Sequence, residues 1–368
     1  MIKQQVLFVF LSLFLILNFS CQEISDQQAG PPNPVILVSP SAFSLESFLN
    51  MSAEKIIDVP SLDLTVVYHE GSPDRYRDAD RLLKRKSARN VHLVKIKGEL
   101  NSENLFRQNP CTDAFQKLFN GSNGVLFFGG DDIPPEIFHE KTHLLTNIET
   151  PKRHYFELSF LFHLLGGFQD ETFVPLLEQN PDYVVLGFCL GMQTLNVATG
   201  GKLIQDIPIE VYNLSCVEDI LELGPDRLHR NYWKNLVTDP GLSSFSFHRI
   251  GFTPGGFFTE ELGFSEQEQP LVASSHHQAV ENPGKNLKIE AMSLDGKIIE
   301  ALSHTKYPNV LGVQFHPEQY FLYDSTGNHI RISPRDSILT NEYQILINSN
   351  SLEFHLEFWR YFSEVLSK

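Results

Sequence analysis

Apolar and polar positions alternate in blocks along this chain, and the blocks predict strands and helices in turn. Short runs of β-branched and aromatic residues predict nine strands, at residues 35–38, 64–69, 91–96, 125–128, 183–188, 271–274, 287–292, 298–303 and 310–315. Helix-like stretches lie between several of them, including residues 113–119, 154–165 and 351–368. This alternation indicates βαβ units and a mostly parallel, doubly wound sheet. The later strands lie close together with an Asp295-Gly296 turn signal, which predicts a small antiparallel β region beside that sheet.

The first residues follow a different pattern. Residues 6–19 are an apolar run after Lys3, too short to span a membrane comfortably and typical of a secretory signal. We therefore expect residues 1–20 to be a signal peptide. Residues 17–21, Leu-Asn-Phe-Ser-Cys, resemble a loosely spelled bacterial lipobox, which predicts lipidation of Cys21 and a lipoprotein facing the periplasm or cell surface. An ordinary cleaved signal and secretion are the alternative. Residues 22–34 are expected to form a flexible polar tether before a single domain at 35–368.

The composition is that of a globular protein, and the net charge argues against nucleic-acid binding. The chain has 368 residues, of which 42% are hydrophobic and 20% charged, as in an ordinary globular protein that can bury a substantial core. Its formal net charge of -16 makes nucleic acid an unsuitable partner, because phosphate binding needs a basic face. The short basic run at residues 81–89 is typical of the solvated face of a helix.

Cys189 is the first candidate for chemistry. It stands between an apolar strand at 183–188 and a helix that runs toward Gly200-Gly201, so it is expected at a strand-to-helix turn. Gly187 and Gly191 would let the backbone bend sharply there, as in a nucleophile elbow. The start of the helix would favour the thiolate and offer free N–H groups to an oxyanion. The alternative is an inert buried cysteine.

His316 and Glu318 provide a candidate base and its orienting carboxylate. They are two residues apart at the end of a strand, so they project to the same side in extended backbone. The alternative is a polar pair that caps the strand. Gly129-Gly130, after another strand, would let a backbone N–H approach a ligand. No catalytic metal is expected, because the H-x-E motif lacks a P-C-x-x-C partner and no H-E-x-x-H is present. Asp131 and Asp132 are common turn residues and are not taken as a cation site.

The motifs GFCLGMQ, SSHHQAV and GVQFHPE, in this order after FFGGDDIPP, resemble the class I glutamine amidotransferase superfamily. They are most similar to its γ-glutamyl hydrolase and γ-glutamyl-GABA hydrolase branch of cysteine peptidases, over residues 35–320. The resemblance implies a flavodoxin-like, three-layer α/β/α sandwich. It implies that Cys189 is the nucleophile, His316 the base and then acid, and Glu318 the orienting group of a triad. It further implies an oxyanion hole at Gly130 and Leu190 and γ-glutamyl contacts at Gly129, Gln193, Ser275 and His276.

Three departures from the branch concern the shape of the substrate pocket. Arg153 is followed by His154, where the branch usually has Arg-Asp, although Glu157 stays in register. Ala273 replaces the usual asparagine of the histidine loop. Residues 211–263 do not align with confidence, and this is where such enzymes vary their acceptor specificity.

The sequence thus predicts an exported hydrolase that cleaves γ-glutamyl peptides, amines or poly-γ-glutamates through a thioester, without a cofactor. Its expected partners are this small substrate and, through Cys21, a membrane. Two alternatives stay open: a glutaminase component of an amidotransferase, and a lipid-anchored binding protein that has lost turnover. The sequence leaves open the oligomeric state and whether Cys111 and Cys216 form a disulfide.

Overall fold

A computed structural model describes residues 33–88 and 90–368 of the chain. The predicted signal peptide, Cys21 and residues 22–32 of the predicted tether lie outside the described residues. The first strand begins at Asn33, two residues before the predicted start of the domain at residue 35.

Twelve strands form one sheet within the described residues. They are β1 (Asn33–Val38), β2 (Leu62–His69), β3 (Val91–Ile96), β4 (Gly124–Phe127), β5 (Val184–Phe188), β6 (Lys202–Ile204), β7 (Ser246–Phe252), β8 (Leu271–Ser274), β9 (Ala279–Asn282), β10 (Leu287–Ser293), β11 (Ile299–His304) and β12 (Val310–Val313). All nine predicted strands are present, with bounds that differ by at most two residues. The sequence did not predict β6, β7 and β9, because these strands are short or mix apolar with polar residues.

Ten α-helices and five 3-10 helices join these strands in the described part of the chain. The α-helices are α1 (Ala42–Ala53), α2 (Pro73–Lys86), α3 (Thr112–Asn120), α4 (Pro151–Leu165), α5 (Leu190–Ala198), α6 (Ile207–Tyr212), α7 (Val217–Leu221), α8 (Phe257–Glu260), α9 (Glu342–Asn348) and α10 (Leu352–Leu366). The 3-10 helices are η1 (Pro135–Phe138), η2 (Leu176–Glu178), η3 (Pro225–Arg227), η4 (Tyr232–Asn235) and η5 (Tyr320–Leu322). The described part of the predicted basic face, residues 81–88, lies at the end of α2 and just beyond it. There Lys84 pairs with Asp80 at 2.7 Å on the surface.

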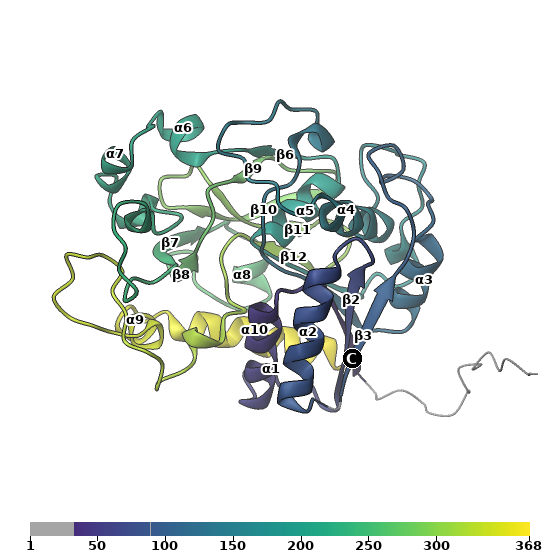
Figure 1. The fold of residues 1–368 in the computed structure, drawn as a ribbon, viewed down its shortest axis with the longest axis horizontal. Coiled ribbons are helices and arrows are strands. Elements are labelled where there is room, and N and C mark those ends of the chain that lie inside the picture. The colour runs from purple at the N-terminus through teal and green to yellow at the C-terminus, as the bar shows by residue number, and fades with distance from the viewer. Residues whose placement is uncertain (1–32, 89) are drawn as a thin grey trace, which may run out of the picture. The chain divides into compact units, whose positions relative to one another are not determined.

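The strand order is β3-β2-β1-β4-β5-β12-β11-β10-β7-β8, with β9 beside β11 and β6 beside β9 (Figure 1). The six strands from β3 to β12 in this order are parallel, whereas β6 to β11 pair antiparallel. In the parallel part β12 lies next to β5, with Val313 opposite Phe188. The carboxyl ends of these two strands therefore meet at one edge of the sheet, where open α/β sheets bind their ligands.

Helices cover both faces of the parallel strands. Successive strand residues point to opposite faces, so an apolar strand needs a core on each side. Leu37 of β1 packs in a core with α1, α2 and α10, whereas its neighbour Val38 packs in a second core with α3, α4 and α5. In Figure 1, α1, α2 and α10 lie together in the lower part of the view, whereas α3, α4 and α5 lie above them and to the right. This confirms the predicted flavodoxin-like α/β/α sandwich. Among the described residues, no helix is both long and apolar enough to cross a membrane.

Candidate active site

Cys189 lies at a sharp turn between β5 and α5, as predicted. Its backbone has φ 53° and ψ −106°, in the left-handed half of conformational space that costs energy for any residue but glycine. The turn is tight enough to require both flanking glycines. A Cβ on Gly187 would lie 2.6 Å from the carbonyl of Gly191, and a Cβ on Gly191 would lie 2.4 Å from the carbonyl oxygen of Phe127. The fold thus keeps a strained cysteine at the carboxyl end of a buried strand.

His316 follows β12 and lies beside Cys189. Its backbone N–H donates to the carbonyl of Ala273 at 2.9 Å, and the backbone N–H of Cys189 donates to the carbonyl of Val313 at 2.8 Å. A Cβ placed on Gly129 would lie 3.1 Å from Cε1 of His316 and 3.6 Å from Cβ of Cys189. The two side chains therefore share one neighbour, Gly129, which lies two residues after the end of β4.

Glu318 is the partner of His316 on the other side of the ring. Its Oε1 lies 2.8 Å from Nδ1 of the imidazole, and since a carboxylate only accepts, Nδ1 carries a proton. Burial lowers the pKa of His316, but the charge of Glu318 and the neighbouring Cys189 outweigh it and raise that pKa to about 10. The imidazole is therefore held in its protonated form at neutral pH.

The turn that carries His316 and Glu318 is fixed from outside by residues that the sequence did not single out. Trp359 of α10 donates its indole N–H to the carbonyl of Pro317 at 2.8 Å, and Tyr323 donates to the same oxygen at 2.8 Å. Ser47 of α1 donates to the carbonyl of Glu318 at 2.8 Å. Trp359 and Ser47 lie far from this turn in the sequence, so no local motif signals their contacts, whereas Tyr323 is only six residues from Pro317.

Arg153 holds the loop that contains Gly129 and Gly130. This buried guanidinium donates to the carbonyl oxygens of Phe128 at 3.0 Å and Gly129 at 3.1 Å, and its Nε donates to Glu157 at 2.7 Å. Because the N–H and C=O of a trans peptide point in opposite directions, a carbonyl of Gly129 turned toward Arg153 turns the N–H of Gly130 away from it. The loop thus presents this N–H on the side opposite the guanidinium.

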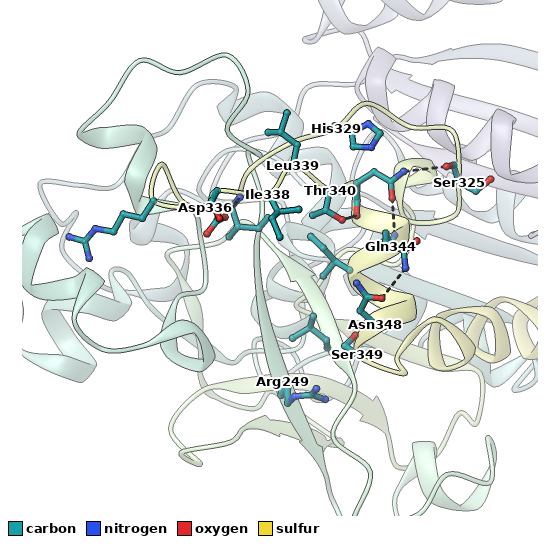
Figure 2. Close-up of a pocket in the computed structure, with 16 residues that line it drawn as sticks. Arg249, Ser325, His329, Asp336, Ile338, Leu339, Thr340, Gln344, Asn348 and Ser349 are labelled. Carbon is teal, nitrogen blue, oxygen red and sulfur yellow. Dashed lines mark hydrogen bonds between the residues drawn. The ribbon is translucent and has the colours of Figure 1, made fainter.

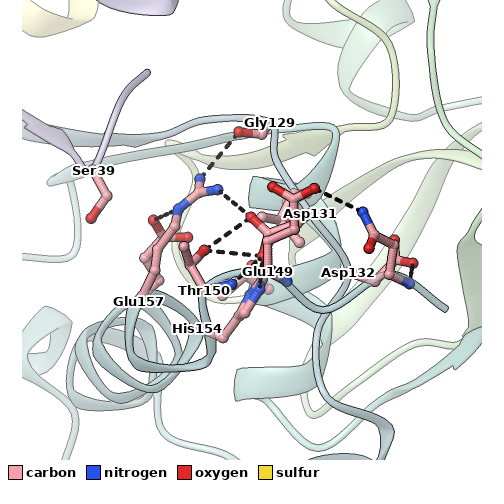
Figure 3. A network of polar contacts seen from close by, with 12 residues as sticks. Ser39, Gly129, Asp131, Asp132, Glu149, Thr150, His154 and Glu157 are labelled. Atoms are coloured by element: carbon pink, nitrogen blue, oxygen red, sulfur yellow. Dashed lines mark hydrogen bonds and ion pairs between the residues drawn. The ribbon is translucent and has the colours of Figure 1, made fainter. Parts of the chain in front are cut away.

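His154 takes the place of the aspartate expected after Arg153 and binds the same loop. Its Nε2 lies 3.0 Å from Oδ2 of Asp131, which also accepts from the backbone N–H groups of Glu149 and Thr150 (Figure 3). Burial raises the pKa of Asp131, but hydrogen bonding and the charge of His154 and Arg153 hold that pKa well below its ordinary value. The aspartate is therefore part of the loop's anchoring.

The remaining predicted contact residues are placed differently from one another. Gln193 is buried on α5 and donates to the carbonyl of Gln278 at 3.2 Å. Ser275 is exposed and contacts the carbonyl of Ser244. The side chain of His276 is turned into the interior, where its Nδ1 lies 2.8 Å from the carbonyl of Gln278, so only its backbone remains a candidate for a ligand contact.

A cavity of about 440 Å³ opens beside Gly130. His277 forms part of its wall and bridges Asp132 and Asp206, each at 3.1 Å. Burial lowers the pKa of His277, but the hydrogen bonds to these two carboxylates raise it to about 9. Residues from the unaligned segment 211–263 complete the wall: Leu214, Ser215, Val217, Ile220, Arg230, Tyr232 and Asn235.

A larger cavity, of about 1010 Å³, lies between Arg249 of β7, Leu271 of β8 and the segment 325–349, which includes α9 (Figure 2). Arg249, Gln344 and residues 335–341 line it, and no predicted site residue does.

Cys111 is buried and Cys216 exposed, and both are free, so the disulfide left open by the sequence is absent.

Comparisons with known proteins agree with the motifs. The peptidase C26 family profile matches residues 105–318. A Rickettsia prowazekii protein whose name describes it as glutamine amidotransferase-like is 28% identical over 225 residues, covering 56% of this chain and 74% of that protein. Gamma-glutamyl-gamma-aminobutyrate hydrolase PuuD of Escherichia coli is 30% identical over 134 residues, covering 36% of this chain and 45% of the relative. A solved Thermoplasma acidophilum structure, described as one component of a GMP synthase, aligns over 91% of this chain and 94% of its own, with 10% identity and a TM-score of 0.41.

Proposed function

Because this chain belongs to the peptidase C26 family of glutamine amidotransferase-like hydrolases, we propose that it hydrolyses γ-glutamyl amide bonds through a thioester on Cys189. The observation that carries the proposal is the strained Cys189 beside a His316–Glu318 pair that is 2.8 Å apart. Strain of this kind persists only where the surrounding fold enforces it, and it occurs mostly at functional sites.

The first half of the reaction forms the thioester. The Cys189 thiolate attacks the δ-carbonyl carbon of the γ-glutamyl group, and the negative charge moves to the carbonyl oxygen. The N–H groups of Gly130 and Leu190, the latter at the start of α5, bind this oxyanion. The carbon–nitrogen bond then breaks, and His316 gives its proton to the leaving amine.

The second half releases glutamate. His316, now neutral at Nε2, accepts a proton from water while the oxygen attacks the thioester carbon. The carbon–sulfur bond breaks and returns the thiolate beside the imidazolium. Glu318 holds the ring in one orientation throughout, as the third member of a triad does. No step requires a cofactor.

The cavity beside Gly130 supports a small amine or peptide as the leaving group. Its volume of about 440 Å³ is near the lower end of the range for small-molecule sites. One part of its wall is apolar, from Ile209, Leu214 and Val217, and another carries Arg230 and Asp206. Such a wall suits an acceptor that has both an apolar chain and a charged end.

A mass-spectrometric time course with γ-glutamyl peptides, γ-glutamyl amines and glutamine tests the proposal. We expect the acceptor amine to be released faster from peptides or amines than ammonia from glutamine. Cys189→Ala should lose activity by about a million-fold, whereas Cys111→Ala, which removes another buried thiol, should keep it. Fast turnover of glutamine alone would favour a glutaminase component. No turnover and no labelling of Cys189 by a glutamine-analogue electrophile would favour the binding protein.

A further inference from the structure

Three histidines and a glutamate from distant parts of the chain meet in the interior, outside the triad. His229 follows η3, His248 lies on β7, Glu300 lies on β11, and His276 belongs to the loop after β8. All four are buried, with exposed fractions of 1%, 0%, 0% and 3%. The proposed hydrolysis uses none of these side chains.

Glu300 is a buried carboxylate without a fixed cationic partner. His248 Nε2 lies 3.0 Å and His229 Nδ1 lies 3.3 Å from its Oε1. Within residues 33–88 and 90–368, imidazoles are the only basic groups within 4.0 Å of this carboxylate. A carboxylate removed from water needs a compensating positive charge, and neutral imidazoles do not supply one. Either an extra proton or a bound cation must balance it.

The hydrogen bonding of the cluster is incomplete in a way that leaves lone pairs free. Both ring nitrogens of His229, Nδ1 of His248, Nε2 of His276 and Oε2 of Glu300 are buried and have no hydrogen-bond partner. Buried polar atoms are nearly always paired, so several in one place call for an explanation. If protonated histidines balanced the charge of Glu300 through a complete hydrogen-bond network, these atoms would have partners.

The tautomer of His276 is set as in a metal ligand. Its Nδ1 lies 2.8 Å from the carbonyl oxygen of Gln278, which can only accept, so this nitrogen carries the proton. Nε2 of the neutral ring therefore has a free lone pair. Histidines that bind metals commonly donate their other N–H to a backbone carbonyl in this manner. The ring lies 5.0 Å, between centroids, from that of His229.

We propose that His229, His248 and Glu300 bind a divalent transition-metal ion, with zinc the best match, and that this ion draws in His276, which lies outside the group of three, as its fourth ligand. One ligand atom from each of the first three residues lies within 4.8 Å of the others. The separations of 3.0 and 3.3 Å between imidazole nitrogens and the carboxylate are close to the edge of a tetrahedron around zinc, about 3.3 Å for bonds of about 2.0 Å. Two or three imidazoles with one carboxylate are a usual zinc donor set.

The metal would be structural and would hold the wall of the substrate cavity. The carbonyl of His229 accepts from the backbone N–H of His276 at 2.9 Å and from Ser274 Oγ at 2.7 Å. The next residue, His277, reaches the cavity and contacts Asp132 and Asp206. An ion bound to His229 and His276 would therefore fix the loop after β8, which carries His276 and His277, to the segment 211–263. This segment forms part of the wall of the substrate cavity. The expectation that hydrolysis uses no metal is unaffected.

Metal analysis of the purified chain tests the proposal directly. After expression with zinc and exchange into metal-free buffer, we expect about one equivalent of bound zinc by mass spectrometry of the ashed protein. Cobalt replacement should give the intense visible absorption of a four-coordinate site. Removal of the ion by a chelator should lower the unfolding midpoint by several degrees, at least about 4 °C.

Variants assign the ion to the cluster. Glu300→Gln keeps the shape of the side chain and should lower the zinc content to less than a tenth of an equivalent, as should His248→Ala. His163→Gln, a buried histidine of α4 that contacts Thr112, should keep it. If the cluster variants do not fold, the zinc content and the cobalt spectrum of the unaltered chain decide whether the site binds a metal ion. Less than a tenth of an equivalent in the unaltered chain after zinc loading, or equal zinc in Glu300→Gln, would overturn the proposal.

Discussion

Replacing Glu318 by glutamine should move the alkaline limit of activity downward. The glutamine keeps the size of the side chain and can still accept from Nδ1 of His316, but it removes the negative charge. In the unaltered chain the proton on His316, whose pKa is raised to about 10, is available to the leaving amine up to about that pH. Activity should then decline as the pH rises through 10, because the general acid is lost.

The size of the change follows from the geometry of the pair. With 2.8 Å between Nδ1 and Oε1, the centres of the two charges lie about 4 Å apart, which corresponds to about 4 kcal/mol at an effective dielectric constant of about 20. Since 1.36 kcal/mol is one pKa unit, the pKa of His316 should fall by about three. The alkaline limit should move from about pH 10 to about pH 7.

The assay is the pH dependence of kcat for release of the acceptor amine from a γ-glutamyl substrate. The alkaline pH limit of kcat reports the pKa of the general acid in the enzyme–substrate complex. In that complex the imidazolium of His316 protonates the leaving amine. Glu178→Gln is the matched control, because it removes a carboxylate from η2 that pairs with Lys306 on the surface. An alkaline limit that stays near pH 10 in Glu318→Gln would refute the reasoning that Glu318 sets the proton affinity of His316.

Three further predictions follow from other parts of the molecule. Lysine has one side-chain nitrogen, so Arg153→Lys cannot contact the carbonyls of Phe128 and Gly129 and also pair with Glu157 as the guanidinium does; kcat should fall about tenfold to a hundredfold while KM changes little, and equal loss in the surface variant Arg85→Lys would contradict this. The pKa of His277 rises from an ordinary 6.5 to about 9 on folding, so its stabilisation of about 3 kcal/mol should be complete below pH 6.5 and lost as the pH rises through 9. Chemical unfolding from pH 6 to 10 should show this decline, and Asp132→Asn should reduce it. Cys21→Ser should abolish fatty-acid labelling of the expressed chain, and unchanged labelling would contradict the proposed lipid anchor.

The sequence predicted the parallel half of the fold well because that half is locally encoded. Most of the predicted run 183–188 forms β5, Val184–Phe188, whose residues are all buried, since an apolar, β-branched run has few alternatives to a buried strand. β7, with the sequence SFHRIGF, was not predicted, because His248 and Arg249 interrupt its apolar pattern. Its histidine is buried beside Glu300, which lies 52 residues away. Pairings over such distances are not visible in local patterns.

The candidate site shows the same division. Motifs predicted Cys189, His316 and Glu318, and the structure brings them to one edge of the sheet next to Gly129. The contact of Trp359 with Pro317 was not predicted, because it spans 42 residues and involves a side chain that reads only as part of an apolar helix face. The role of Arg153 likewise depends on backbone carbonyls of another element, whose direction no sequence pattern specifies.

The most direct test of the account is to capture the acyl-enzyme. The purified chain is mixed with a γ-glutamyl peptide, quenched in acid during turnover and measured by intact-protein mass spectrometry, followed by peptide mapping. We predict a population heavier by one γ-glutamyl group, located on Cys189, labile to hydroxylamine and absent from Cys189→Ala. Amine release without such a group, or a group located on any other residue, would contradict the central claim that Cys189 is the nucleophile of a γ-glutamyl hydrolase.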